Sequence, residues 1–165
     1  MLLSVVVILV QSCLSTARLS DLPRSAEGYD FNRIAVSKKT VQDKVWDAGT
    51  GSEYYLETFV TIDSIIMHAG INALNREGFL VKFVDRRAGA IVGQRGMTAN
   101  AWNSVAGVYY KKNSDGYEIY VRYVITQDIT GGWRDDKAQK IGTDICAALG
   151  SKCVQSYSVN TEVPR

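Results

Sequence analysis

The 165-residue chain has little of several residue types, and each shortage narrows what the protein can be. One histidine and three cysteines do not favour a structural zinc site with several ligands. Two prolines and fourteen glycines leave little room for a long flexible linker. The 19 basic residues nearly cancel the 17 acidic ones, so the net charge of +2 does not favour nucleic acid as a partner. With 46% hydrophobic residues, the composition excludes a wholly disordered chain and a multi-span membrane protein.

The N-terminus opens with an uncharged apolar run, LLSVVVILV, from Leu2 to Val10. A transmembrane helix needs about 20 such residues, whereas the apolar region of a secretory signal has about 7–15. The run therefore favours a signal segment that ends at Cys13. A plain signal peptide without lipid is one alternative. A buried strand is another, because β-branched residues suit strands.

The sequence from Val10 to Cys13, VQSC, resembles the lipobox of bacterial lipoproteins. The resemblance implies that residues 1–12 are removed as a signal peptide and that the Cys13 thiol receives a lipid such as palmitate. Because Leu14 and not Asp follows the cysteine, it also implies the outer membrane, facing the periplasm. We expect the lipidated cysteine and a tether over 13–28, one domain over 29–155 and a C-terminal tail over 156–165.

Two cysteines remain after Cys13, and they are seven positions apart. Cys146 lies near a predicted helix end, and a turn at Gly150 separates it from Cys153. Such a turn can bring the two Cβ atoms within about 4 Å, as a disulfide requires. Disulfides persist in the periplasm and are rare in the cytosol, so this prediction agrees with an exported protein. The alternative is a pair of free, buried thiols.

Hydrophobic spacing predicts two helices separated by antiparallel strands. The first helix, ended by Gly78, has an apolar stripe at helical spacing. The second begins near Asp135 and carries another such stripe. Strands are expected at 79–84, 90–92, 104–110 and 117–126, and residues 54–62 fit either a further strand or the approach to the first helix. The expected stripes are Ile66, Ala69, Gly70, Ala73 and Leu74 in the first helix, and Ala138, Ile141, Ile145 and Leu149 in the second.

The last of these strands shows the clearest alternation, with Ile119, Val121 and Tyr123 on one face and Tyr120 and Arg122 on the other. One buried and one wet face is typical of an antiparallel sheet in an α+β fold. We therefore expect an antiparallel sheet of three to four strands with both helices packed on one face.

The order from the first helix to the last is similar in outline to the helix-grip domains of small bacterial envelope lipoproteins. The residues that carry the resemblance are Ala73-Leu74, Gly78-Phe79, Asp85 and Gly89-Ala90-Ile91-Val92. It covers about residues 60–150 and concerns the fold, so it implies no active site.

Catalytic motifs are absent from the sequence: it contains no GxSxG, HExxH or CxxC. His68 falls off the apolar stripe of its helix, so a partly exposed histidine is a better interpretation than a catalyst. Gly89, Gly93 and Gly96 fit turns and bulges better than a phosphate-binding loop, which would need a following lysine and helix. No catalytic residue, cofactor or metal site is expected.

Two groups of side chains are candidates for binding. Arg86 and Arg87 belong to a set of cations around the first hairpin that also includes Arg76, Lys82 and Arg95. Tyr120 and Arg122 occupy the expected wet face of the sheet. Arginine and tyrosine often anchor protein interfaces, because each combines a large area with directional polar contacts.

The sequence thus predicts a membrane-anchored periplasmic lipoprotein that is not an enzyme and that binds or scaffolds a protein partner in an envelope assembly. The alternative of another class is a small envelope hydrolase with an unrecognised site. A cytosolic nucleic-acid binder comes third, because the export signal argues against nucleic acid.

Overall fold

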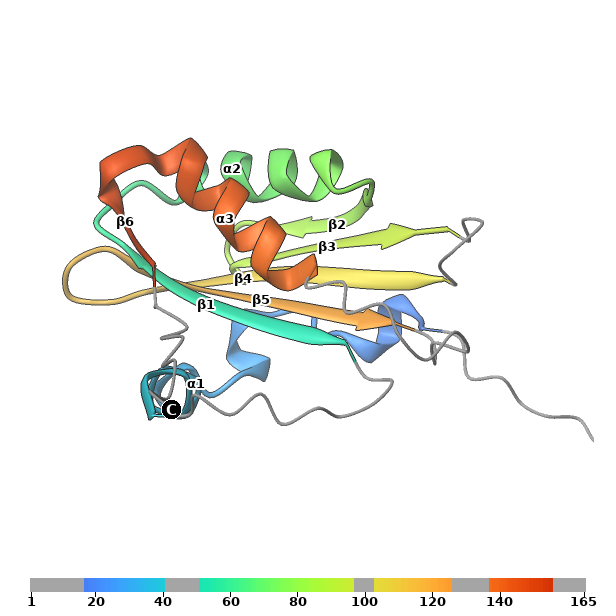
Figure 1. Ribbon diagram of the computed structural model, residues 1–165, viewed down its shortest axis with the longest axis horizontal. Coiled ribbons are helices and arrows are strands. Elements are labelled where there is room, and N and C mark those ends of the chain that lie inside the picture. Colours follow the sequence, from blue (N-terminus) through green and yellow to red (C-terminus); the bar gives the residue numbers. More distant parts are fainter. Residues whose placement is uncertain (1–16, 41–50, 97–102, 126–136, 156–165) are drawn as a thin grey trace, which may run out of the picture.

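The computed structural model describes residues 17–40, 51–96, 103–125 and 137–155, and Cys13 lies outside them. These residues form an α+β fold built on one antiparallel sheet with the strand order β2-β3-β4-β5-β1-β6 (Figure 1). The strands are β1 (Ser52–Thr58), β2 (Leu80–Asp85), β3 (Ala90–Arg95), β4 (Ser104–Lys112), β5 (Tyr117–Ile125) and β6 (Cys153–Gln155). The helices are α1 (Phe31–Thr40), α2 (Asp63–Arg76) and α3 (Lys137–Leu149).

The sheet has six strands, so the expectation of three to four was too low. The first additional strand is β1, which pairs with β5 although 58 residues lie in the sequence between Thr58 and its partner Tyr117. The second is β6, whose three residues pair with β1. A three-residue strand has too few positions to display an alternating pattern, and pairing between distant segments leaves no local signal.

One face of the sheet is covered by α2 and α3, as the sequence predicts (Figure 1). Every residue expected in the two apolar stripes is buried. Gly78 follows α2 with a φ of +82°, a left-handed conformation that glycine adopts without strain. A Cβ atom at Gly142 would collide with the ring of Tyr54, so glycine at this position lets α3 lie close to β1.

The opposite face is covered by residues 17–35, which we call the strap (Figure 1). The strap contains two short 3-10 helices, Leu19–Asp21 and Ala26–Gly28, and the first residues of α1. Its apolar side chains pack on an aromatic part of the sheet. The buried members are Ala17, Leu22, Ala26 and Phe31 of the strap and Tyr55, Ala90, Val92, Val105, Tyr109 and Tyr120 of the sheet.

The strap differs from the sequence-based expectation in two ways. Residues 17–28 were expected to belong to a tether, yet they pack against the sheet. The face that carries Tyr120 was expected to be wet, yet the strap buries it. The strap's apolar residues are irregularly spaced among polar ones, so neither a helical nor a strand period marks them as core residues.

Tyr29 fastens the middle of the strap to the sheet. Its ring lies edge-on to the rings of Tyr109 and Tyr120, with centroid distances of 4.7 and 4.8 Å. The Tyr109 hydroxyl donates a hydrogen bond to the Pro23 carbonyl oxygen at 2.8 Å, and the Ala26 N–H donates to the Ala88 carbonyl oxygen at 2.8 Å. Because helices cover one face and the strap covers the other, large parts of the exposed surface lie at the ends and edges of the sheet.

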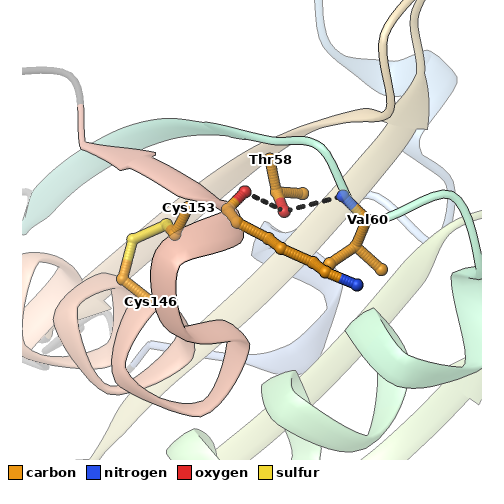
Figure 2. The surroundings of a disulfide bond; sticks show 5 residues. Thr58, Val60, Cys146 and Cys153 are labelled. Carbon is orange, nitrogen blue, oxygen red and sulfur yellow. Dashed lines mark hydrogen bonds between the residues drawn. A yellow bond between two sulfur atoms is a disulfide. The ribbon is translucent and has the colours of Figure 1, made fainter.

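A disulfide bond attaches β6, the last strand at one edge of the sheet, to α3 (Figure 2). The sulfur atoms of Cys146 in α3 and Cys153 in β6 lie at bonding distance, and their Cα atoms are 5.3 Å apart. The Thr58 hydroxyl donates to the Lys152 carbonyl oxygen at 2.8 Å and accepts from the Val60 N–H at 3.1 Å. Covalent and hydrogen bonds together therefore hold β6 against the end of β1.

Candidate functional site

Three large apolar side chains are exposed where β1 gives way to α2. Phe59 is 57% exposed, Ile62 53% and Ile65 45%. Phe59 follows the last residue of β1, Ile62 precedes α2, and Ile65 lies beside the buried stripe of that helix. Such side chains are normal when scattered singly, but here three lie within seven residues at one end of the sheet, and groups of exposed apolar side chains mark interaction sites. We call these three residues the apolar patch.

An ion pair joins this patch to the turn between β2 and β3. The Arg86 guanidinium donates through Nε to Asp63 Oδ2 at 2.9 Å and through Nη2 to Asp63 Oδ1 at 2.6 Å. This two-pronged hydrogen bonding by Arg86 lowers the pKa of the Asp63 carboxyl below its ordinary value. The pair fixes the turn beside the first residue of α2.

The turn itself exposes Arg87. Asp85 Oδ1 accepts hydrogen bonds from the Arg87 and Ala88 N–H groups, each at 2.9 Å. Gly89 completes the turn with a φ of +62°. The turn is thus held by the Asp85 carboxylate and not by the Arg87 side chain, which is exposed. We call Phe59, Ile62, Ile65, Arg86 and Arg87 the end surface.

Lysines lie beside the end surface. Lys112, at the end of β4, is opposite Tyr117, which is in turn opposite Thr58. The Lys152 carbonyl oxygen accepts the Phe59 N–H at 2.8 Å, so Lys152 also belongs to this end. Both lysines are exposed, and within the described ranges neither they nor Arg87 form an ion pair. This end of the sheet therefore exposes apolar side chains together with the cations Arg87, Lys112 and Lys152.

The second predicted binding group, Tyr120 with Arg122, does not form an open surface. Tyr120 is only 2% exposed and lies beneath Tyr29 and Phe31. Arg122 forms an ion pair with Glu53 on β1 at 2.6 Å. The prediction of Tyr120 as an accessible binding residue is wrong, because the strap occupies this face of the sheet.

The cations expected around the first hairpin are divided between two ends of the molecule. Arg76, at the end of α2, pairs with Asp144 of α3 at 3.0 Å. The side chain of Arg95, at the end of β3, lies near Gly78. Arg86 and Arg87 lie at the turn, a strand length of roughly 17–20 Å away. Sequence neighbours along a hairpin do not form one patch when they occupy its turn and its open end.

A shallow hollow with a volume of about 390 Å³ lies along α3 beside the C-terminal end of α2. Its carboxylates are already paired, Glu77 with Lys137 at 2.8 Å and Asp144 with Arg76 at 3.0 Å. These pairs join the two helices, so a structural role accounts for them. The residues lining the hollow are Glu77, Gln139, Lys140, Thr143 and Asp144.

A pair of glutamates on adjacent strands is an arrangement that sequence reasoning missed. Glu57 of β1 lies opposite Glu118 of β5. The Tyr55 hydroxyl lies 3.1 Å from Glu57 Oε1 and 2.7 Å from Glu118 Oε1. Burial, and then the hydrogen bond to Glu118, raises the pKa of Tyr55. A neutral donor thus separates two like charges that would otherwise repel each other across the strands.

The described residues contain no group of three or more His, Cys, Asp or Glu side chains placed to hold a metal ion. His68 is exposed on α2. In the same part of the chain, none of the helices combines the length and the apolar character needed to cross a membrane.

No protein-family model matches this chain, and no curated protein sequence matches it either. The one sequence signal for Phe59 and Ile62 is that they are apolar and lie between a predicted strand and the apolar stripe of the following helix.

Proposed function

We propose that the protein is a bacterial envelope lipoprotein, anchored through Cys13, whose domain binds a protein partner without catalysing a reaction. The observation that carries the binding role is the end surface, where Phe59, Ile62 and Ile65 are exposed together beside Arg87. Aromatic residues and arginine are enriched in protein interfaces, and exposed apolar patches are uncommon elsewhere.

The cysteines support the compartment. Cys146 and Cys153 lie at disulfide-bonding distance, and disulfides are stable in the periplasm but rare in the cytosol. The likeness of VQSC to a lipobox supports a lipid on the third cysteine, Cys13. The proposal thus gives every cysteine a role: Cys146 and Cys153 form the disulfide, and Cys13 carries the lipid.

The anchor is tested by lipid labelling of the full chain in a bacterial host. We expect incorporation of radiolabelled palmitate that Cys13→Ser abolishes, with the variant released from membranes into the soluble periplasmic fraction. Fractionation of the native chain is expected to place it in the outer membrane. Unchanged palmitate incorporation in Cys13→Ser would refute the anchor.

The binding role is tested with Phe59→Ser combined with Ile62→Ser. After cross-linking in cells, we expect this double variant to recover less of the partner than the native chain does. Leu80→Ser is the matched control, because Leu80 is 61% exposed but lies on β2, outside the end surface. Equal recovery by the double variant and the native chain would overturn the assignment of the surface.

Replacing Tyr120 and Arg122 would not test binding, because Tyr120 is part of the core beneath the strap. Arg87 is a better probe than Arg86. Only the Arg86 side chain fixes the position of α2 through Asp63.

A further inference from the structure

We infer that the anchored domain holds its end surface away from the membrane and presents it to a protein with an acidic, apolar contact surface. This inference rests on the proposed lipid anchor at Cys13. It adds the orientation of the domain and the chemistry of the partner, and it excludes the anchoring membrane as the occupant of the end surface.

The strap begins at the end of the sheet opposite the end surface. The Asn103 side-chain amide donates to the Ala17 carbonyl oxygen at 3.1 Å, and Asn103 directly precedes β4. Ser104, the first residue of β4, is opposite Arg95 and Ile125. Ala17, four residues after Cys13, therefore lies at the start of β4.

The end surface lies beyond the other end of the same strand. Lys112, the last residue of β4, is opposite Tyr117, and Tyr117 is opposite Thr58, next to Phe59. β4 has nine residues and so spans about 26 Å. Figure 1 shows β4 running along the length of the sheet, with the crossing from β1 to α2 at one end.

The tether is too short to bring both ends to one membrane. Four peptide units separate Cys13 from Ala17, which can span at most about 14 Å when fully extended. If the end surface pointed into the lipid, the start of the strap would lie about 26 Å or more above it. A lipid on Cys13 therefore prevents Phe59 and Ile62 from entering the same leaflet end-on.

Charge indicates what the end surface fits. Arg87, Lys112 and Lys152 form no ion pair among the residues that the structure describes. Hydrogen bonds from neutral donors to Asp85 and Asp115 leave their negative charges in place, and Asp63 is paired with Arg86. The cations near the end surface (Arg86, Arg87, Lys112 and Lys152) therefore outnumber these three carboxylates by one. Exposed apolar side chains beside an excess of cations complement a protein surface on which carboxylates accompany apolar side chains.

The orientation is tested by energy transfer on the lipidated chain in vesicles of phosphatidylethanolamine and phosphatidylglycerol that contain an acceptor-labelled headgroup. Donor fluorophores are attached in separate samples to Ile62→Cys and to Gly96→Cys. Gly96 directly follows β3 at the strap end, and a side chain there meets no atom within 4 Å. We expect stronger transfer from position 96 than from position 62, and equal or reversed transfer would overturn the orientation.

Failure of the anchor gives a different result. If the native chain is not lipidated, both donors lose transfer together, as they would in a Cys13→Ser background, and the proposed function fails. If the lipidated chain binds the vesicles but position 62 is as close to them as position 96, the anchor stands and the inference fails.

The partner's chemistry is tested by a photo-cross-linking amino acid at position 59 in cells, with the same residue at position 80 as the control. The adduct is mapped by mass spectrometry, and we expect the cross-linked peptide to contain carboxylates beside apolar residues. Arg87→Glu should weaken binding to the purified, identified partner at least tenfold, roughly the loss expected at an interface hot spot, and Arg87→Lys should largely restore it.

Three results would contradict the assignment. They are a contact peptide without acidic residues, binding that Arg87→Glu leaves unchanged, and adducts with lipid alone. As a direct check on lipid, the Cys13→Ser chain is mixed with phosphatidylglycerol vesicles. Sedimentation with these vesicles that Phe59→Ser abolishes would make the end surface a membrane-binding site and overturn the inference.

Discussion

The two faces of the sheet are covered in different ways. On one face α2 and α3 pack mainly aliphatic side chains, including Ile66, Leu74 and Ile141, against the strands. On the other face the strap packs mostly irregular chain against tyrosine rings, including Tyr109 and Tyr120. Both faces are buried, yet only the helical cover follows a regular period.

The difference teaches that burial and periodicity are separate properties of a segment. A helix repeats its buried positions every three to four residues, so the sequence reveals its apolar face. The strap is held by single contacts, such as the ring of Tyr29 and the hydrogen bond to the Pro23 carbonyl oxygen, and these leave no repeat. We therefore expect loss of stability to be largest where helices form the core and smaller at the strap.

The largest effect is expected in the helix-covered core. Ile66→Ala should lower the free energy of unfolding by about 3 kcal/mol, because Ile66 is fully buried and its removal leaves a cavity. Urea denaturation followed by circular dichroism measures the change. Ile65→Ala on the same helix is the matched control and should cost well under about 1 kcal/mol, since Ile65 is 45% exposed. Similar losses in the two variants would contradict the packing described for α2.

The disulfide is expected to have the next largest effect. Replacing both Cys146 and Cys153 with Ala should lower the free energy of unfolding by about 2–3 kcal/mol, because the bond closes a short loop in the unfolded chain. Urea denaturation of the native chain with and without reductant should reproduce the difference, and the double variant should not respond to reductant. Thiol labelling of both cysteines in the native, unreduced protein would show that the bond does not form.

A smaller effect is expected at the strap. Tyr29→Ala removes two edge-on ring contacts and should cost about 1.5–2 kcal/mol. Tyr29→Phe keeps the ring and should cost less than half as much. The free energy of unfolding is measured as before, and near-ultraviolet circular dichroism reports the tyrosine packing. If Tyr29→Ala lowered the free energy of unfolding more than Ile66→Ala does, the strap and not the helix-covered core would contribute more to stability, against this prediction.

The same contrast explains how much of the fold the sequence predicts. All nine expected stripe residues of α2 and α3 are buried, because tertiary packing uses the period that the sequence contains. Alternation in β5 correctly separates Tyr123 from Tyr120, since the two tyrosines belong to different cores. Alternation along a strand does not reveal whether a second layer covers the face opposite the helices. For this reason the sequence wrongly predicted that Tyr120 is exposed.

The candidate site was predictable only in part. Arg87 is exposed on its turn, as expected for a hairpin residue. Arg86 is engaged by Asp63, which lies 23 positions earlier in the chain, and no local pattern predicts such a pair. Phe59 and Ile62 are exposed because β1 ends before them and the buried stripe of α2 begins after them. Their exposure therefore depends on element boundaries, which sequence patterns locate poorly.

The smallest effect is expected from acid, which should act on the helix-covered face through Asp63. Because Arg86 lowers the folded-state pKa of this carboxyl, the pair stabilises the fold above the unfolded-state pKa of about 3.9, and this contribution is lost as the pH falls through the folded-state value. Asp63→Asn should therefore narrow the difference between urea midpoints measured at neutral pH and at about pH 3. Asp21→Asn is the control in the strap, where the carboxylate accepts the Arg18 N–H. The hydrogen bonds that join the strap to the sheet through Pro23 and Ala26 involve no carboxyl group. If Asp21→Asn narrowed the difference between the two urea midpoints more than Asp63→Asn does, this account of how the two faces are held would be wrong.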